Sequence, residues 1–162
     1  PELLRRYREK QEPLSESKLG EPITNEDLLQ LDCTVLVPAA LSEQITGANA
    51  GKLRCRILAE GANGPTTLEA DRILTDKGIF IIPDILANSG GVIVSYFEWV
   101  QDVQRFFWKA KDIQDRLQDI ITSAFHRTLQ FSVQRRTTMR MAALMSGIDK
   151  VAQAHLQRGL YP

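Results

Sequence analysis

Three short apolar runs constrain the fold of this chain more than any other feature. They begin at residues 34, 56 and 79, and each run is followed by proline or glycine within a few positions. The runs are Thr34-Val35-Leu36-Val37, Arg56-Ile57-Leu58-Ala59 and Ile79-Phe80-Ile81-Ile82. Because they are mostly continuous in their apolar character rather than alternating, they are typical of strands that are buried on both faces of a parallel sheet.

Amphipathic stretches between and after these runs predict helices. Pro65 in the first turn and Gly78 just past the end are the usual punctuation of a helix over 66–76. Thr24 and Asp27 have the spacing of a capping box before a short helix that reaches Leu31. The other helices are expected over residues 3–10, 42–49, 91–108, 113–134 and 138–158.

The alternation of strand and helix indicates the α/β class. Three parallel strands followed by C-terminal helices correspond to the second half of a doubly wound, Rossmann-type sheet. The first half of such a nucleotide-binding domain carries a G-x-G-x-x-G loop, which does not occur here, and residue 1 is Pro1 rather than methionine. We therefore expect residues 1–90 to be a partial dinucleotide-binding domain whose first half is missing, and residues 91–162 to be a helical segment.

The missing half predicts a physical property of the isolated chain. In the complete sheet the first strand of the absent half would lie beside the strand near Val35. Without it, that strand is an open apolar edge and a template for pairing with other chains. We therefore expect the isolated chain to associate with itself.

Charge and composition argue against several classes of partner. Twenty basic residues balance 20 acidic ones without long runs of either sign, so neither a nucleic acid nor a membrane surface is an expected partner. No stretch approaches the ~20 apolar residues of a membrane span. Cys33 and Cys55 are more typical of reduced thiols in a cytoplasmic protein than of a disulfide framework. His126 and His155 have no further ligands at suitable spacing, so no metal site is predicted.

Asparagines follow two of the three strands, at the edge where open α/β sheets bind ligands. Asn63 and Asn88 both lie near glycines. An asparagine amide offers a donor and an acceptor, so it can hold a ribose hydroxyl or a carboxamide. Asparagine is also a common turn residue that tolerates the left-handed region and caps helices. The residues alone leave these two interpretations about equally favoured.

Three longer blocks resemble the glutamate dehydrogenases. They read D-C-T-V-L-V-P-A-A-L over 32–41, A-E-G-A-N-G-P-T-T over 59–67 and P-D-I-L-A-N-S-G-G-V-I-V-S-Y-F-E-W-V-Q over 83–101. The ending L-Q-R-G-L-Y-P is also similar to the C-terminus of that family. Leucine and phenylalanine dehydrogenases share the sheet but lack S-Y-F-E-W, so the resemblance favours glutamate as the substrate.

The resemblance implies roles for five residues. Asn63 would contact the ribose on the nicotinamide side of NAD or NADP, Asn88 would lie beside the nicotinamide, and Ala39 would contact the cofactor through its backbone. Ser95 would donate a hydrogen bond to the side-chain carboxylate of glutamate, and Val92 would line the same pocket. Residues 92 and 95 are three apart, so they share a helix face. Taken alone, Ser95 would more simply be a helix serine that faces solvent or bonds back to the chain.

The resemblance also implies an activity and what this chain lacks for it. The family oxidises L-glutamate to 2-oxoglutarate and ammonia, and its members form hexamers, so the parent protein is expected to be a homo-oligomer. Its catalytic lysines and aspartate, its phosphate loop and the residue that selects NAD or NADP have no match here. We expect this chain to be inactive alone. The charged residues that could be mistaken for catalytic ones are expected to be solvated or in loops: Lys52, Lys77, Lys109, Lys111 and Asp84.

Two other hypotheses remain open at this point. The chain could be a non-catalytic binding or oligomerisation module derived from the same family. An unrelated small α/β domain would require the three matching blocks to be a coincidence.

Overall fold

The computed structural model describes Arg5, Glu9 and residues 20–159. The chain divides into two compact units, residues 1–31 and residues 32–162. The division expected after residue 90 lies inside the second unit, and it stays a prediction.

The first unit contains helix α2, Asn25–Leu29, which begins with the expected capping box. The Thr24 hydroxyl accepts a hydrogen bond from the Asp27 backbone N–H at 3.0 Å. The Asp27 carboxylate accepts one from the Thr24 N–H at 3.4 Å. The helix expected over 3–10 lies outside the described residues except for Arg5 and Glu9, whose side chains form an exposed ion pair of 3.7 Å.

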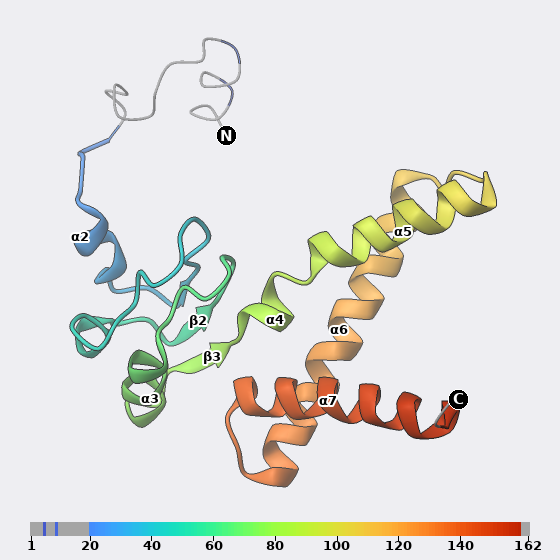
Figure 1. Cartoon of the computed structure of the whole chain (residues 1–162). Helices are drawn as coiled ribbons and strands as arrows, with labels where there is room; N and C mark the ends of the chain where they lie inside the picture. Colours follow the sequence, from blue (N-terminus) through green and yellow to red (C-terminus); the bar gives the residue numbers. More distant parts are fainter. Residues whose placement is uncertain (1–4, 6–8, 10–19, 160–162) are drawn as a thin grey trace. The chain divides into compact units, whose positions relative to one another are not determined.

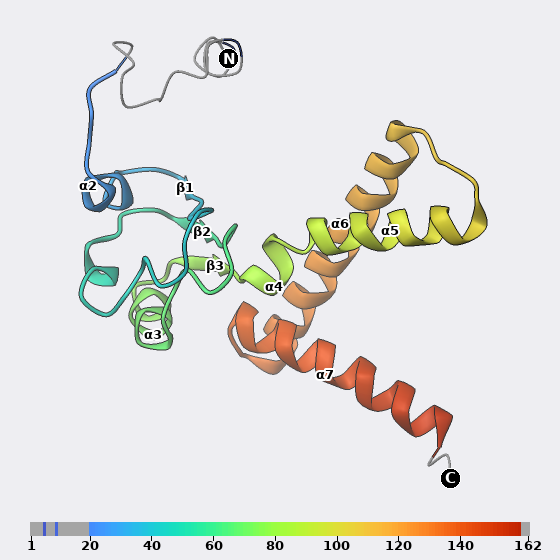
Figure 2. The same ribbon diagram turned by 45° about the horizontal axis from the view of Figure 1, so that its top comes forward.

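The second unit is built on a sheet of three parallel strands in the order β1-β2-β3 (Figure 2). Strand β1 is Val35–Leu36, β2 is Ile57–Ala59 and β3 is Phe80–Ile82. Leu36 pairs with Leu58, and Leu58 pairs with Ile81. The α/β class and the three expected strands are thereby confirmed, and β1 is an edge strand of this sheet.

Helix α3, Leu68–Asp76, connects β2 to β3 and contributes to the apolar core. Its N-cap is Thr67, whose side chain accepts a hydrogen bond from the Ala70 N–H at 3.3 Å. The core on this side is made of side chains that are at most 1% exposed: Ile45, Leu53, Leu58, Ala70 and Leu74. This densely buried part holds the strand ends, and therefore the loops that follow them, in fixed positions.

The helix expected over 42–49 does not form, which corrects that prediction. The segment instead runs beside residues 64–67, where the Glu43 N–H donates to the Gly64 carbonyl at 2.8 Å and the Ile45 N–H to the Pro65 carbonyl at 2.9 Å. The Asn49 side chain accepts from the Thr46 N–H at 2.8 Å. Because an asparagine amide can replace backbone partners in this way, it competes with helix formation. Only a 3₁₀ turn, η2, follows at Ala50–Lys52.

In the described part of the chain, four helices follow β3 (Figure 1). They are α4 (Asp84–Ala87), α5 (Gly90–Gln104), α6 (Ala110–Arg135) and α7 (Met139–Arg158). Helix α5 packs on α6, α6 packs on α7, and α7 returns to contact β3. None of the described helices is long and apolar enough to cross a membrane.

Helix α5 is shorter than the helix expected over 91–108, because the chain turns out of it at Arg105. Arg105 has a left-handed conformation with φ 52°. Gln101 is only 7% exposed. Its side-chain carbonyl accepts a hydrogen bond from the Trp108 N–H at 2.6 Å, and its amide donates to the Phe97 carbonyl at 3.0 Å. This buried amide stabilises the turn between α5 and α6, which no periodicity in the sequence indicates.

Candidate functional site

An open depression of about 820 Å³ lies at the carboxyl ends of the strands. The segment that follows each of the three strands contributes to its lining. The lining residues come from residues 40–42 after β1, residues 61–63 after β2, Asn88 after β3, and the first turns of α5 at Gly91, Val92 and Ser95. Four of the expected site residues therefore surround one space, although up to 32 positions separate them in the sequence: Asn63, Asn88, Val92 and Ser95.

Ala39, the fifth expected site residue, does not line the depression, although its neighbour Ala40 does. Ala39 lies against the loop after β2: a Cβ added to Gly61 would be 3.0 Å from the Ala39 Cβ. The Ala62 N–H also donates to the Pro38 carbonyl at 2.8 Å. The glycine at position 61 thus allows the loops after β1 and β2 to meet at the edge of the depression.

Asn63 and Asn88 are joined by a direct hydrogen bond. The side-chain amide of Asn88 donates to the side-chain carbonyl of Asn63 at 2.7 Å. Neither residue adopts the positive φ that asparagine tolerates in turns; the non-glycine residues that do so in the described part are Glu43, Arg105 and Arg136. The left-handed part of the structural interpretation therefore does not apply, whereas its capping part is confirmed for Asn88, which is the C-cap of α4. The pair leaves the Asn63 amide N–H groups and the Asn88 carbonyl oxygen available to a ligand.

Val92 and Ser95 occupy the exposed face of α5 that lines the depression. Val92 is 76% exposed, so its aliphatic side chain is open to a ligand in the depression. In the part of the chain that the structure describes, no group bonds to the Ser95 hydroxyl, so Ser95 does not bond back to its own helix. An apolar surface next to an unpaired hydroxyl suits a ligand with an aliphatic stem and a polar end.

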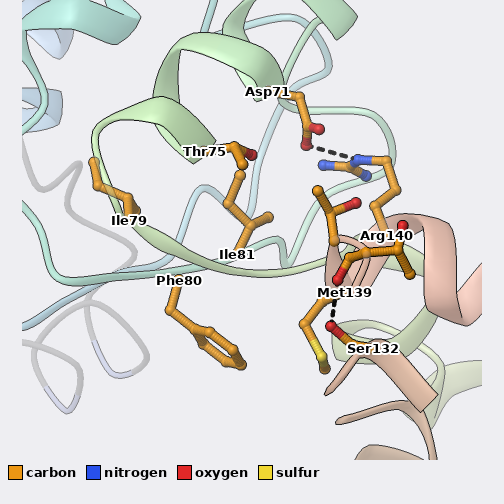
Figure 3. Close-up of a pocket in the computed structure, with 10 residues that line it drawn as sticks. Asp71, Thr75, Ile79, Phe80, Ile81, Ser132, Met139 and Arg140 are labelled. Carbon is orange, nitrogen blue, oxygen red and sulfur yellow. Dashed lines mark hydrogen bonds and ion pairs between the residues drawn. The ribbon is translucent and has the colours of Figure 1, made fainter. Parts of the chain in front are cut away.

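A buried charge cluster lies next to the loops that carry the asparagines. Glu60, the residue after β2, is completely buried. Arg140 in the first turn of α7 donates to both of its carboxylate oxygens, at 2.7 and 2.9 Å. Arg140 also donates through Nε to Asp71 of α3 at 2.8 Å (Figure 3). Its Nη1 lies 3.6 Å from the Asp84 carboxylate. One guanidinium therefore contacts three carboxylates.

The cluster determines the charge state of Arg140. Burial by itself would lower the pKa of Arg140, but hydrogen bonds to Glu60 and then to Asp71 outweigh it, and the pKa is raised above the usual arginine range. Arg140 is thus a permanent cation in this environment, and the bidentate geometry with Glu60 is the strong form of the arginine–carboxylate interaction.

The expectation that Asp84 is a solvated surface or loop residue is wrong. Asp84 is the first residue of α4, and its side chain is 19% exposed. Its carboxylate accepts the Gly64 N–H and the Ile85 N–H, both at 2.8 Å. Sequence reasoning missed the role of this residue, and it missed Glu60 and Arg140 altogether. A glutamate directly after an apolar strand was the available signal, but nothing in the sequence indicates a partner 80 residues away.

The cysteines and candidate metal ligands add no second site. Cys33 and Cys55 are both free thiols, as expected. Burial, and after it the neighbouring Cys33, raise the pKa of the Cys55 thiol. Among the described residues, no three of histidine, cysteine, aspartate and glutamate are grouped in a way that could hold a metal ion.

A parallel sheet with a polar depression at its carboxyl edge is the arrangement of ligand-binding α/β proteins. Within that class, the chain belongs to the Glutamate/Leucine/Phenylalanine/Valine dehydrogenase family, which it matches over residues 1–159. It is 47% identical over 161 residues to the glutamate dehydrogenase of Thermotoga maritima, covering 99% of this chain and 39% of that protein. It is 48% identical over 140 residues to a catabolic NAD-specific glutamate dehydrogenase of Bacillus subtilis, covering 86% of this chain and 33% of that protein.

Solved structures show the same relationship. A hetero-hexameric glutamate dehydrogenase of Thermus thermophilus matches 99% of this chain and 38% of its own, with a TM-score of 0.87 and 28% identity. The glutamate dehydrogenase of Peptoniphilus asaccharolyticus matches 77% of this chain and 32% of its own, with a TM-score of 0.74 and 39% identity. The chain thus spans about two fifths or less of the length of these relatives.

Proposed function

We propose that this chain is part of an NAD(P)-dependent glutamate dehydrogenase, which oxidatively deaminates L-glutamate to 2-oxoglutarate and ammonia. The observation that carries the proposal is the position of Asn63, Asn88, Val92 and Ser95 around one depression at the strand ends. Membership of the dehydrogenase family and the names of the relatives support the same reaction.

The depression suits the nicotinamide side of NAD or NADP. The Asn63 amide retains donors for a ribose hydroxyl, and the Asn88 carbonyl retains an acceptor for a carboxamide. Their mutual hydrogen bond of 2.7 Å holds both amides in place before a ligand arrives. Backbone atoms near Ala39, which meets Gly61 at the rim, would complete this side of the site. The cofactor would supply the hydride acceptor for the oxidation of the amino acid.

The face of α5 suits the side chain of glutamate. The Ser95 hydroxyl would donate a hydrogen bond to the distal carboxylate, and the exposed Val92 would pack against the methylene groups. Removing a hydrogen bond to a charged group costs about 1.5–3 kcal/mol. Ser95 therefore contributes to the recognition of glutamate over amino acids with apolar side chains.

The test is glutamate-dependent reduction of NAD and of NADP by the longest reading frame that contains this chain. Ser95→Ala is measured beside Ser123→Ala, a matched change at an exposed position of α6. We expect Ser95→Ala to lower kcat/KM for glutamate by about tenfold or more and Ser123→Ala to leave it unchanged. An inactive wild-type protein, or equal effects of the two changes, would contradict the proposal.

We further propose that this chain alone does not turn over glutamate, because no lysine of the described part lines the depression. The parent protein is proposed to be a homo-oligomer. Exposed apolar residues on α5 and α7, such as Trp99, Val103 and Ile148, are consistent with burial in such an assembly. If the longest reading frame is well folded and inactive, the competing hypothesis of a non-catalytic binding or oligomerisation module is favoured instead.

A further inference from the structure

We propose that Arg140 is a positioning residue of the cofactor site, which acts through Glu60 and Asp84 on the two loops that carry Asn63 and Asn88. The inference rests on the proposed function, because it assigns a task to those asparagines. It adds α7, a helix that contributes nothing to the lining of the depression, to the elements that control the site.

The first connection runs from Arg140 to the start of α4. The guanidinium holds both oxygens of the buried Glu60 carboxylate, at 2.7 and 2.9 Å. The oxygen that receives the longer of these bonds also accepts the Asp84 backbone N–H at 2.9 Å. Glu60 therefore fixes the first residue of α4, and the last turn of this four-residue helix ends at Asn88. A rotation of Glu60 would displace the helix start that determines where the Asn88 amide lies.

The second connection runs from Asp84 to the loop of Asn63. One Asp84 oxygen lies 3.6 Å from Arg140 Nη1. The other oxygen accepts the Gly64 N–H at 2.8 Å, and Gly64 directly follows Asn63. Gly64 has a φ of 53°, so the chain turns sharply at the residue that Asp84 holds. The two connections thus begin at one guanidinium and end on the two members of the asparagine pair.

The third partner of Arg140 provides an internal control. Asp71 lies on α3 and accepts from Arg140 Nε at 2.8 Å, at the side of the guanidinium that Figure 3 shows. No hydrogen bond joins Asp71 to the loops of Asn63 or Asn88 among the described residues. A change at Asp71 or at Asp84 therefore weakens the contacts of Arg140. Only the change at Asp84 also removes a hydrogen bond to a loop that carries an asparagine.

The experiment compares Asp84→Asn with Asp71→Asn in the longest reading frame that contains this chain. An asparagine at 84 has one acceptor oxygen. The Ile85 N–H and Arg140 Nη1 both face the Oδ1 position, so the asparagine oxygen is expected there and the Gly64 N–H loses its partner. An asparagine at 71 keeps an oxygen for Arg140. Three quantities are measured: the KM for NAD or NADP, the KM for glutamate, and hydrogen–deuterium exchange of the peptide that covers residues 61–65.

We expect Asp84→Asn to raise the cofactor KM by about tenfold and to speed the exchange of the Gly64 amide by a similar factor. The KM for glutamate should change less than about twofold, because Ser95 is on α5. Asp71→Asn should lower the unfolding midpoint and leave the cofactor KM and the exchange rate near the wild-type values. Arg140→Lys keeps the charge but cannot form the bidentate contact with Glu60, so its cofactor KM should rise as well.

The outcomes separate this inference from the proposed function. If Asp84→Asn leaves the exchange of the Gly64 amide unchanged, or if Asp71→Asn raises the cofactor KM equally, the positioning role is wrong even when the wild-type protein is active. An Arg140→Lys variant with wild-type kinetics overturns it too. Wild-type protein that does not reduce NAD or NADP overturns the proposed function, whereas the exchange measurement still tests the connection from Asp84 to the Asn63 loop.

Discussion

Two ion pairs of this chain have almost the same length and very different surroundings. Arg140 is 2.7 Å from Glu60, and the two side chains are 18% and 0% exposed. Lys111 is 2.8 Å from Asp115, with side chains 79% and 58% exposed. If distance determined the contribution of an ion pair, removing either cation would cost the same. If burial determines it, the two costs should differ severalfold.

The perturbation is Arg140→Met, with Lys111→Met as the matched control. Methionine retains part of the aliphatic stem in both cases. Without Arg140, Glu60 remains buried with only the Asp84 N–H as a partner, and leaving one member of a buried pair costs about 3–5 kcal/mol. Removing the exposed pair, which spans one helical turn, should cost at most about 0.5 kcal/mol.

The assay is equilibrium unfolding in urea, followed by circular dichroism. With a slope of about 2 kcal/mol per molar urea, the Arg140→Met midpoint should fall by about 2 M and the Lys111→Met midpoint by about 0.2 M or less. Adding Glu60→Gln to Arg140→Met should recover part of the loss, because the buried charge is then removed. Equal midpoints for the two single variants, or no recovery in the double variant, would refute the reasoning from burial.

Three further outcomes follow from the described contacts. Gln101→Leu should lose about 1–3 kcal/mol of unfolding free energy because the Trp108 N–H loses its acceptor, while Gln104→Leu at an exposed position should lose little in the same unfolding assay. The pKa of Cys55 is raised above its ordinary value of 9.0, so at a pH above that value the folded state holds more protons than the unfolded state. The free energy of unfolding should therefore fall as the pH rises in this range. Cys55→Ala should remove this part of the pH dependence. The isolated chain should associate through β1, where Val35 is 48% exposed, and Val35→Lys should reduce the association seen by light scattering.

The sequence was informative about the sheet and the lining of the depression because both depend on short-range patterns. Continuous apolar runs identified all three strands to within one residue at either end. Since parallel strands end at one edge, the loops that carry Asn63 and Asn88 had to be neighbours. The resemblance then added Val92 and Ser95, and the structure places both on the same depression.

The features that the sequence could not reveal depend on contacts between distant segments. Arg140 looks like an ordinary polar position in an amphipathic helix until α7 returns to the sheet and meets Glu60, 80 residues earlier. The segment 42–49 has helical character, but its backbone bonds to residues 64 and 65. Gln101 ends α5 by binding a backbone N–H seven residues ahead. Each of these outcomes is a tertiary contact that overrides a local propensity.

The contact between Glu60 and Arg140 can form only after both residues have been synthesised, and the two are 80 residues apart. A ribosome adds roughly 5–20 residues per second, so the 80 residues that separate the two partners take about 4–16 s to make. Strand β3, Phe80–Ile82, is completed early in that interval, and until Arg140 is made the carboxylate at the end of β2 has no cation. The nascent sheet therefore cannot close its carboxyl edge until the first turn of α7 has left the ribosome, and the asparagine pair takes its final position only after that.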